Sequence, residues 1–193
     1  EKGNANLEVE KGISSEIGID FNRGNFQTSI TPFVYYFSNY IFLKPTGNFS
    51  VLPHGGQVYE YAQSKALVTG FEWTFQQRMH QWQVNGTFEY LYNKQINNAN
   101  GNFPLPFSTP INAFLEVSYL LEDSSFRKQS KIYANTKWAS AQTRIAQNEE
   151  VTPSYVLVGG GLQSDFQIGK LKPTLRLQAS NLLNTKYYNH ASF

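Results

Sequence analysis

Apolar and polar residues alternate with period two along most of this chain. In its last such stretch, Leu175 and Leu177 alternate with Arg176 and Gln178. Because successive side chains of a β-strand point to opposite faces, this pattern predicts strands with one apolar and one polar face. The predicted strands span residues 16–21, 26–42, 59–76, 82–92, 111–121, 132–138, 155–167 and 175–180.

The segments between these strands are alternately short and long. Short turns are predicted at 22–25, 77–81, 122–128 and 169–173, and long polar loops at 44–56, 93–106, 139–153 and from 184 onward. An outer-membrane barrel has tight turns at its periplasmic end and long loops outside. The sequence therefore predicts an all-β fold, an antiparallel transmembrane β-barrel segment of about eight strands, most of them roughly 10 residues or longer.

One predicted strand contains a residue that does not fit a regular ladder. Pro32 lies in the middle of the 26–42 strand, whose predicted apolar face carries Phe26, Thr28, Ile30, Val34, Tyr36, Tyr40 and Phe42. Proline has no backbone N–H and removes one hydrogen bond from the ladder. We expect a local β-bulge at this position.

The amino-acid composition favours strands that meet an apolar environment. Aromatic residues make up 16% of the chain and charged residues only 16%, against roughly 25% charged residues in a typical soluble protein. A carbohydrate-binding β-sandwich has a similar composition, and there the apolar faces pack against each other. In a membrane barrel the apolar faces meet lipid and the polar faces line the interior.

Two groups of side chains follow from the barrel interpretation. Aromatic residues near strand ends are expected at the membrane interfaces: Tyr36, Tyr40, Trp73, Trp82, Tyr90, Tyr92, Tyr119 and Trp138. The polar faces are expected to direct seven charged side chains inward: Glu72, Glu89, Glu116, Lys131, Lys137, Asp165 and Arg176.

Several classes of function have no support in the sequence. The net charge of +2 and the lack of a basic cluster argue against a nucleic-acid partner. The chain has no cysteine, no phosphate-binding loop and no nucleophile elbow, and its three histidines lack the spacing of metal ligands. We therefore expect no enzyme, no cofactor and no metal site.

Three separated motifs resemble TonB-dependent outer-membrane receptors. The run Ala-Ser-Asn-Leu-Leu-Asn-Thr-Lys-Tyr at 179–187 resembles the penultimate-strand motif of that family, a small residue followed by Asn-Leu-(Leu/Phe)-(Asn/Asp)-x-x-Tyr. Residues 61–72 resemble the family strand Tyr-x-Gln-x-x-Ala-x-x-x-Gly-x-Glu. Residues 3–18 resemble a Gly-Asn-x-x-Leu-x-x-Glu segment that leads into a Glu-x-Gly strand.

The resemblance implies a location and a function. Residues 1–193 would be the C-terminal portion of a 22-stranded barrel in the outer membrane of a Gram-negative bacterium, without the plug domain and the final strand. Such a receptor imports a scarce ligand, such as siderophore-bound iron, haem, a metal complex, cobalamin or a glycan. The expected partners are the lipid bilayer, the small extracellular ligand and the TonB complex, which acts through the plug.

The expected ligand contacts lie in the external loops. The candidates are His54, His190, Phe49, Phe103 and Tyr155, with a joint contact of the two histidines as one option. Two other classes remain open from the sequence: a passive outer-membrane porin, and a secreted β-sandwich that binds carbohydrate.

Overall fold

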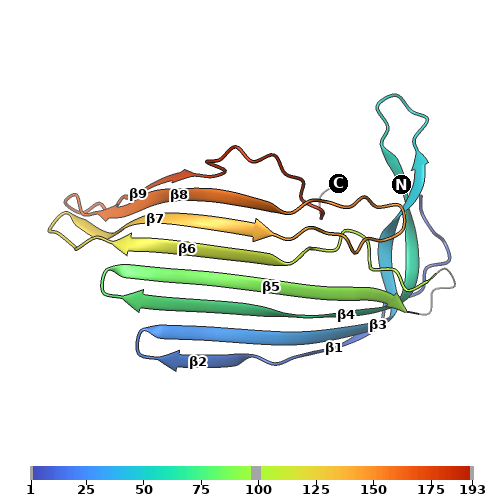
Figure 1. Ribbon diagram of the computed structural model, residues 1–193, viewed down its shortest axis with the longest axis horizontal. Helices are drawn as coiled ribbons and strands as arrows, with labels where there is room; N and C mark the ends of the chain where they lie inside the picture. The colour runs from blue at the N-terminus through green and yellow to red at the C-terminus, as the bar shows by residue number, and fades with distance from the viewer. Residues whose placement is uncertain (1, 97–100, 192–193) are drawn as a thin grey trace.

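A computed structural model describes residues 2–96 and 101–191 (Figure 1). They form one antiparallel sheet of nine strands, in the order β1-β3-β4-β5-β6-β7-β8-β9, with β2 also paired to β3. The strands are β1 (Gly12–Glu16), β2 (Ile19–Arg23), β3 (Phe26–Phe49), β4 (Gln57–Met79), β5 (Trp82–Ile96), β6 (Asn112–Leu120), β7 (Arg127–Ala139), β8 (Tyr155–Phe166) and β9 (Thr174–Ala179). Among the described residues, no helix is long and apolar enough to cross a membrane.

The predicted antiparallel arrangement of about eight strands is confirmed: the nine strands fill eight positions, since β1 and β2 occupy one position along the edge of β3. They are separated at Ile17 and Gly18, opposite Pro32 and Thr31. The Ile17 N–H donates to the Pro32 carbonyl at 3.1 Å. Pro32 has no N–H to return this bond, and the ladder is therefore interrupted there.

The expected bulge at Pro32 was wrong. Pro32 pairs in regular register with Phe71 of β4, because its missing donor affects only the edge that faces β1 and β2. A bulge of β3 lies instead between Phe37 and Tyr40, which pair with Ala66 and Ser64, and a second irregularity lies between Pro45 and Phe49. Ser38 and Asn39 of β3 thus lie opposite the single Lys65 of β4, and the additional residue reverses the faces beyond it.

This bulge corrects the predicted face of two aromatic residues. Tyr40 and Phe42 were expected beside Tyr36, but the register places them on the opposite, polar face. The ring centroids of Phe37 and Tyr40 lie 4.9 Å apart, which confirms that these two side chains share a face.

The connections separate to the two ends of the sheet (Figure 1). The four short turns lie together at one end, and the β5–β6 and β7–β8 loops lie at the other. The predicted loop at 44–56 is shorter than expected, because β3 continues to Phe49 and β4 begins at Gln57. The resulting β3–β4 hairpin extends beyond its neighbours and turns away from the direction of the other strands.

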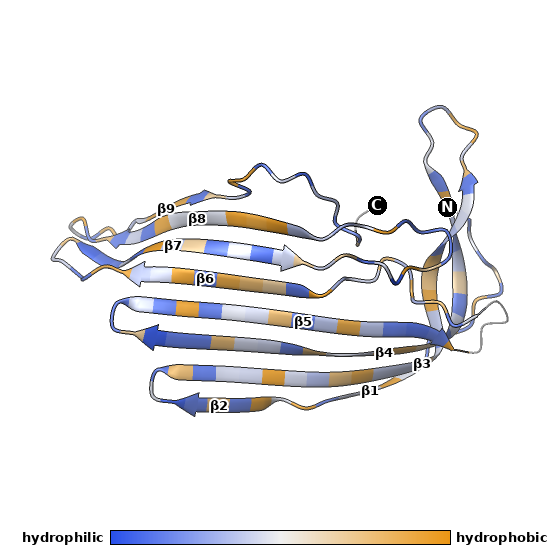
Figure 2. Ribbon diagram, viewed as in Figure 1, coloured by the Kyte–Doolittle hydropathy of each residue, from blue (hydrophilic) through white to orange (hydrophobic). Residues whose placement is uncertain are grey.

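The sheet is a single layer with almost no apolar core. Figure 2 shows apolar and polar residues mixed along the strands rather than gathered at a buried centre. Within the described residues the buried hydrophobic side chains are Ala66, Leu105, Ala139 and Ala146. The accessible surface is 12956 Å², against roughly 9,300 Å² for a compact protein of this mass. A sandwich, in which two such faces cover each other, is not formed by these residues.

The apolar face carries a band bounded by aromatic residues. Trp82 of β5 pairs with Tyr119 of β6, and their ring centroids are 5.0 Å apart. Tyr92 lies ten residues along β5 on the same face, about 33 Å away at about 3.3 Å per residue. With the strands tilted by about 45°, the band is about 23 Å tall. This height is close to the apolar band of roughly 25 Å found on outer-membrane barrels.

Candidate functional site

The polar face of the sheet is the hollowed face. A cavity of about 500 Å³ opens there over β6 to β9. Of the seven charged side chains predicted to point inward, four line it: Glu116, Lys131, Lys137 and Arg176. Glu72 and Glu89 lie opposite each other across β4 and β5, and Asp165 accepts a hydrogen bond from Thr174. The prediction that charged side chains gather on one face is confirmed for the cavity.

Charge pairing within this cavity is uneven. The Lys131 ammonium lies 2.9 Å from the Glu116 carboxylate, and both side chains are largely buried. Arg176 instead donates to the side-chain carbonyl of Gln163 at 3.0 Å. An ion pair therefore lies beside a guanidinium that is held by a neutral amide.

Gly159 of β8 lines the cavity, and Gly161 lies on the same face two residues along the strand. A Cβ atom at Gly161 would lie 2.3 Å from the Leu177 carbonyl oxygen and 2.7 Å from the Tyr133 hydroxyl. At Gly159 it would lie 2.7 Å from Oδ1 of Asn135. Side chains from β7 occupy the space above both glycines, and this close packing explains the glycine run inside a strand.

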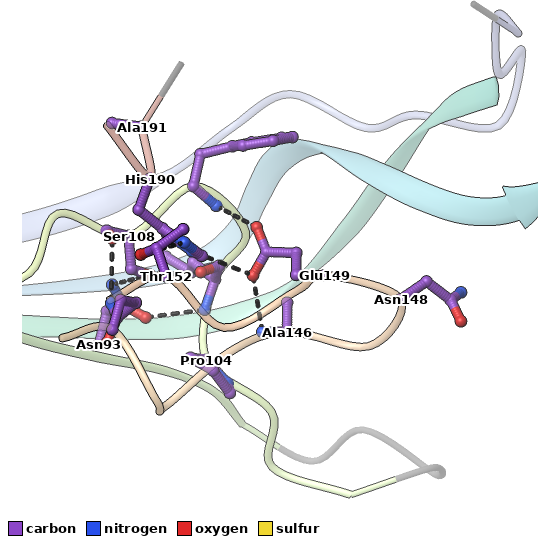
Figure 3. Close-up of polar contacts among 12 residues, drawn as sticks. Asn93, Pro104, Ser108, Ala146, Asn148, Glu149, Thr152, His190 and Ala191 are labelled. Atoms are coloured by element: carbon purple, nitrogen blue, oxygen red, sulfur yellow. Dashed lines mark hydrogen bonds and ion pairs between the residues drawn. The ribbon is translucent and has the colours of Figure 1, made fainter. Parts of the chain in front are cut away.

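At the other end of the sheet, Glu149 of the β7–β8 loop connects three segments (Figure 3). Its carboxylate accepts hydrogen bonds from the Phe107 N–H at 2.6 Å and the Ala146 N–H at 2.7 Å. His190 Nε2 lies 3.7 Å away, and the two side chains are only 4% and 6% exposed. On its other nitrogen, His190 Nδ1 shares a hydrogen bond of 3.3 Å with the Thr152 hydroxyl.

A second polar group fixes the β5–β6 loop. Asn93 donates to Ser108 Oγ at 2.8 Å and accepts from the Leu105 N–H at 2.7 Å. Arg144 donates to the Asn93 carbonyl, and its guanidinium lies 4.0 Å from the ring centre of Tyr92. Neither Glu149 nor Arg144 was a candidate from sequence, because a polar loop shows no pattern that tells a buried anchor from a solvated residue.

The predicted ligand-contact residues fall into three places. Phe49 and His54 lie at the tip of the β3–β4 hairpin, where Phe49 is 73% exposed and His54 has a φ of 62°. Phe103 and His190 lie in the loop cluster, the group of contacts around Glu149 and Asn93 described above. The Phe103 carbonyl accepts a hydrogen bond there from the Gln95 N–H at 2.8 Å. Tyr155, at the start of β8, packs against Tyr187 with ring centroids 4.6 Å apart. No group of three or more His, Asp or Glu in the described parts of the chain is arranged to hold a metal ion.

The chain matches one protein-family model and several solved structures. Residues 1–182 match the family "TonB dependent receptor-like, beta-barrel". The "Copper transporter OprC" superposes with a TM-score of 0.79 at 15% identity, over 98% of this chain and 29% of that one. A P. aeruginosa FpvA bound to heterologous pyoverdines gives a TM-score of 0.60 at 19% identity, over 95% of this chain and 24% of FpvA. The FpvAI–pyocin S2 complex gives 0.61 with the same identity and coverage.

These structures share the fold with this chain, which spans less than a third of their length. No curated protein sequence matches the chain.

Proposed function

The chain belongs to the TonB-dependent receptor β-barrel family, and from that premise we propose that it forms part of the wall of an outer-membrane barrel that imports a scarce ligand with energy from TonB. The observation that carries this proposal is the exposed apolar face with aromatic residues at both ends, which would be about 23 Å tall at the strand tilt of a membrane barrel. A face of this height bounded by Trp and Tyr suits the hydrocarbon layer of a bilayer. The opposite face, with its charged cavity, suits a water-filled interior.

We further infer that residues 1–193 are the C-terminal portion of the barrel. Residues 179–187 resemble the penultimate-strand motif, and the second edge of β9 pairs with no described strand. In this assignment the plug domain and the closing strand are supplied by other parts of the protein. The long loops at the end opposite the short turns are then extracellular, and there the ligand is first met.

Ligands of several chemical classes are compatible with this function. Among the solved structures, OprC is a copper transporter, and FpvA is in complex with pyoverdine and iron. At identities of 15% and 19% neither cargo transfers to this chain. The ligand-contact candidates Phe49, His54, Phe103, Tyr155 and His190 remain proposals for the external side.

Expression of the full-length protein in a Gram-negative host tests the location and the coupling together. We expect it in the outer-membrane fraction, with a mobility on gels that changes on heating, as a closed barrel gives. Ligand uptake should stop when TonB is deleted. Uptake that continues unchanged without TonB would favour the passive porin, and a protein found soluble outside the membrane would contradict both.

A further inference from the structure

Five aromatic side chains of β3 lie in a row on the polar face. This aromatic strip consists of Phe33, Tyr35, Phe37, Tyr40 and Phe42. Ring centroids lie 5.2 Å apart for the first pair, 4.9 Å for Phe37 and Tyr40, and 6.3 Å for Tyr40 and Phe42. Nearer the short turn, the same face of β3 carries only polar residues, Gln27, Ser29 and Thr31.

The strip depends on the bulge in β3. Without the additional residue between Phe37 and Tyr40, the rings of Tyr40 and Phe42 would point to the apolar face. With it, the strip runs about 26 Å along the strand, since eight register steps of about 3.3 Å separate its ends. It extends from the membrane segment into the hairpin that leads to the extracellular side.

Small residues border part of the strip on both sides. On β1, Gly12 and Ser14 pair with Phe37 and Tyr35, and on β4 Gly70 pairs with Phe33. A Cβ atom at Gly12 would lie 2.7 Å from the Phe37 ring, and one at Gly70 would lie 2.9 Å from the Phe33 ring. The rings are half-buried and lean over residues without side chains. They lie beside a cavity of about 560 Å³ that is lined by Gly12–Glu16, Tyr35 and Phe37.

The surroundings of the strip are acidic. The Tyr35 hydroxyl donates to the Glu16 carboxylate at 3.3 Å, and the Ile41 N–H donates to the Glu10 carboxylate at 2.9 Å. Burial and, after it, this Glu10 carboxylate raise the pKa of the Tyr40 hydroxyl. At the outer end of the same face, Glu60 lies 3.9 Å from Lys44, and this ion pair adds no net charge to the two carboxylates above. An anionic chelate is repelled by such a border, whereas hydroxyl groups donate hydrogen bonds to it.

We propose that the aromatic strip binds a neutral oligosaccharide. This proposal names the class of ligand and rests on the import function proposed above. The C–H groups of a sugar ring carry a partial positive charge and are attracted to the negative face of an aromatic ring. Sugar hydroxyls donate to the carboxylates at the border. A strip of about 26 Å accommodates several sugar rings in a row.

Binding to the full-length protein in detergent tests this inference. The probes are maltohexaose, cellohexaose and mannohexaose, with an anionic ferric triscatecholate complex as the comparison, measured by titration calorimetry. We expect at least one hexaose to bind, and Tyr40→Ala to weaken it about tenfold. Tyr36→Ala is the matched control, since Tyr36 belongs to the same strand but to the apolar face. It should leave the affinity within about twofold.

Three results would overturn the inference: no hexaose binds the folded protein, the ferric complex binds more tightly than every hexaose, or the two variants lose affinity equally. Gel mobility with and without heating confirms that each variant is folded. The import function fails separately, because it is measured as TonB-dependent uptake in cells. TonB-dependent uptake of a metal chelate by a protein that binds no hexaose would support the import function and contradict only the binding of a glycan.

Discussion

An arginine placed at the middle of the apolar band should show whether this face meets lipid. Leu115 of β6 lies on the apolar face and pairs with Gly86 of β5. Gly86 is four residues from Trp82 and six from Tyr92, about 9 Å and about 14 Å in height at a tilt of about 45°. Leu115 is therefore near the bilayer midplane if the aromatic residues mark the two interfaces.

The expected cost of Leu115→Arg follows from this height. An arginine at the midplane of a membrane barrel costs about 2–4 kcal/mol, which lowers the folding equilibrium constant roughly 30- to 700-fold. The matched control is Thr87→Arg, at nearly the same height on β5 but on the polar face. There the guanidinium meets the water-filled interior, and we expect a change below about 1 kcal/mol.

Urea unfolding of the full-length protein in phospholipid vesicles, followed by tryptophan fluorescence, measures both variants. The unfolding midpoint should fall for Leu115→Arg with an unchanged slope, and stay nearly constant for Thr87→Arg. Equal costs for the two variants, or a larger cost for Thr87→Arg, would refute the orientation of the two faces and with it the membrane band.

Three further substitutions test the loop cluster and the sheet. Glu149→Ala removes the acceptor of two backbone N–H groups and should destabilise the loops by about 2–4 kcal/mol, measured as faster hydrogen exchange at 105–108. Glu150→Ala, which changes the exposed neighbour, should leave the exchange unchanged. Equal exchange in both variants would contradict the role of Glu149 as an anchor. Gly161→Ala places a Cβ 2.3 Å from a backbone oxygen and should lower the urea unfolding midpoint. The control Gly18→Ala, whose Cβ meets no atom within 4 Å, should leave the midpoint unchanged. An unchanged midpoint for Gly161→Ala would show that β9 is free to move. Lys131→Met leaves the carboxylate that lies 2.9 Å from Lys131 without a cation and should lower the free energy of unfolding by about 1–2 kcal/mol. Lys131→Arg should keep most of this stability in the same unfolding assay. An equal loss in both variants would assign the effect to packing.

Much of the fold could be predicted because the decisive signals are local. Strand positions follow from period two, and the alternation of short and long connections predicted the two ends of the sheet. The three family motifs at 3–18, 61–72 and 179–187 lie within single segments, and the family they indicated is the one that the chain matches. The interruption at Pro32 was also visible in the sequence, although its effect falls on the edge toward β1 and β2 rather than in a bulge.

The site was less predictable because it depends on pairs of distant residues. The hydrogen bonds around Glu149 and His190 join distant segments. The Phe107 N–H donates to the Glu149 carboxylate, and the Thr152 hydroxyl shares a hydrogen bond with His190. A polar residue in a loop has the same appearance in a sequence whether it is solvated or buried. His190 was singled out as an external residue, and the structure places it in a buried contact with Thr152.

The sequence by itself determined which residues share a face within each uninterrupted strand, because the alternation of side chains is a property of the extended backbone. Only the tertiary structure decided the face of Tyr40 and Phe42, since the bulge exists as a mismatch between β3 and the register of β4. It also decided which loops meet around Glu149. Both outcomes depend on hydrogen bonds to a partner segment, and a single strand or loop does not contain that information.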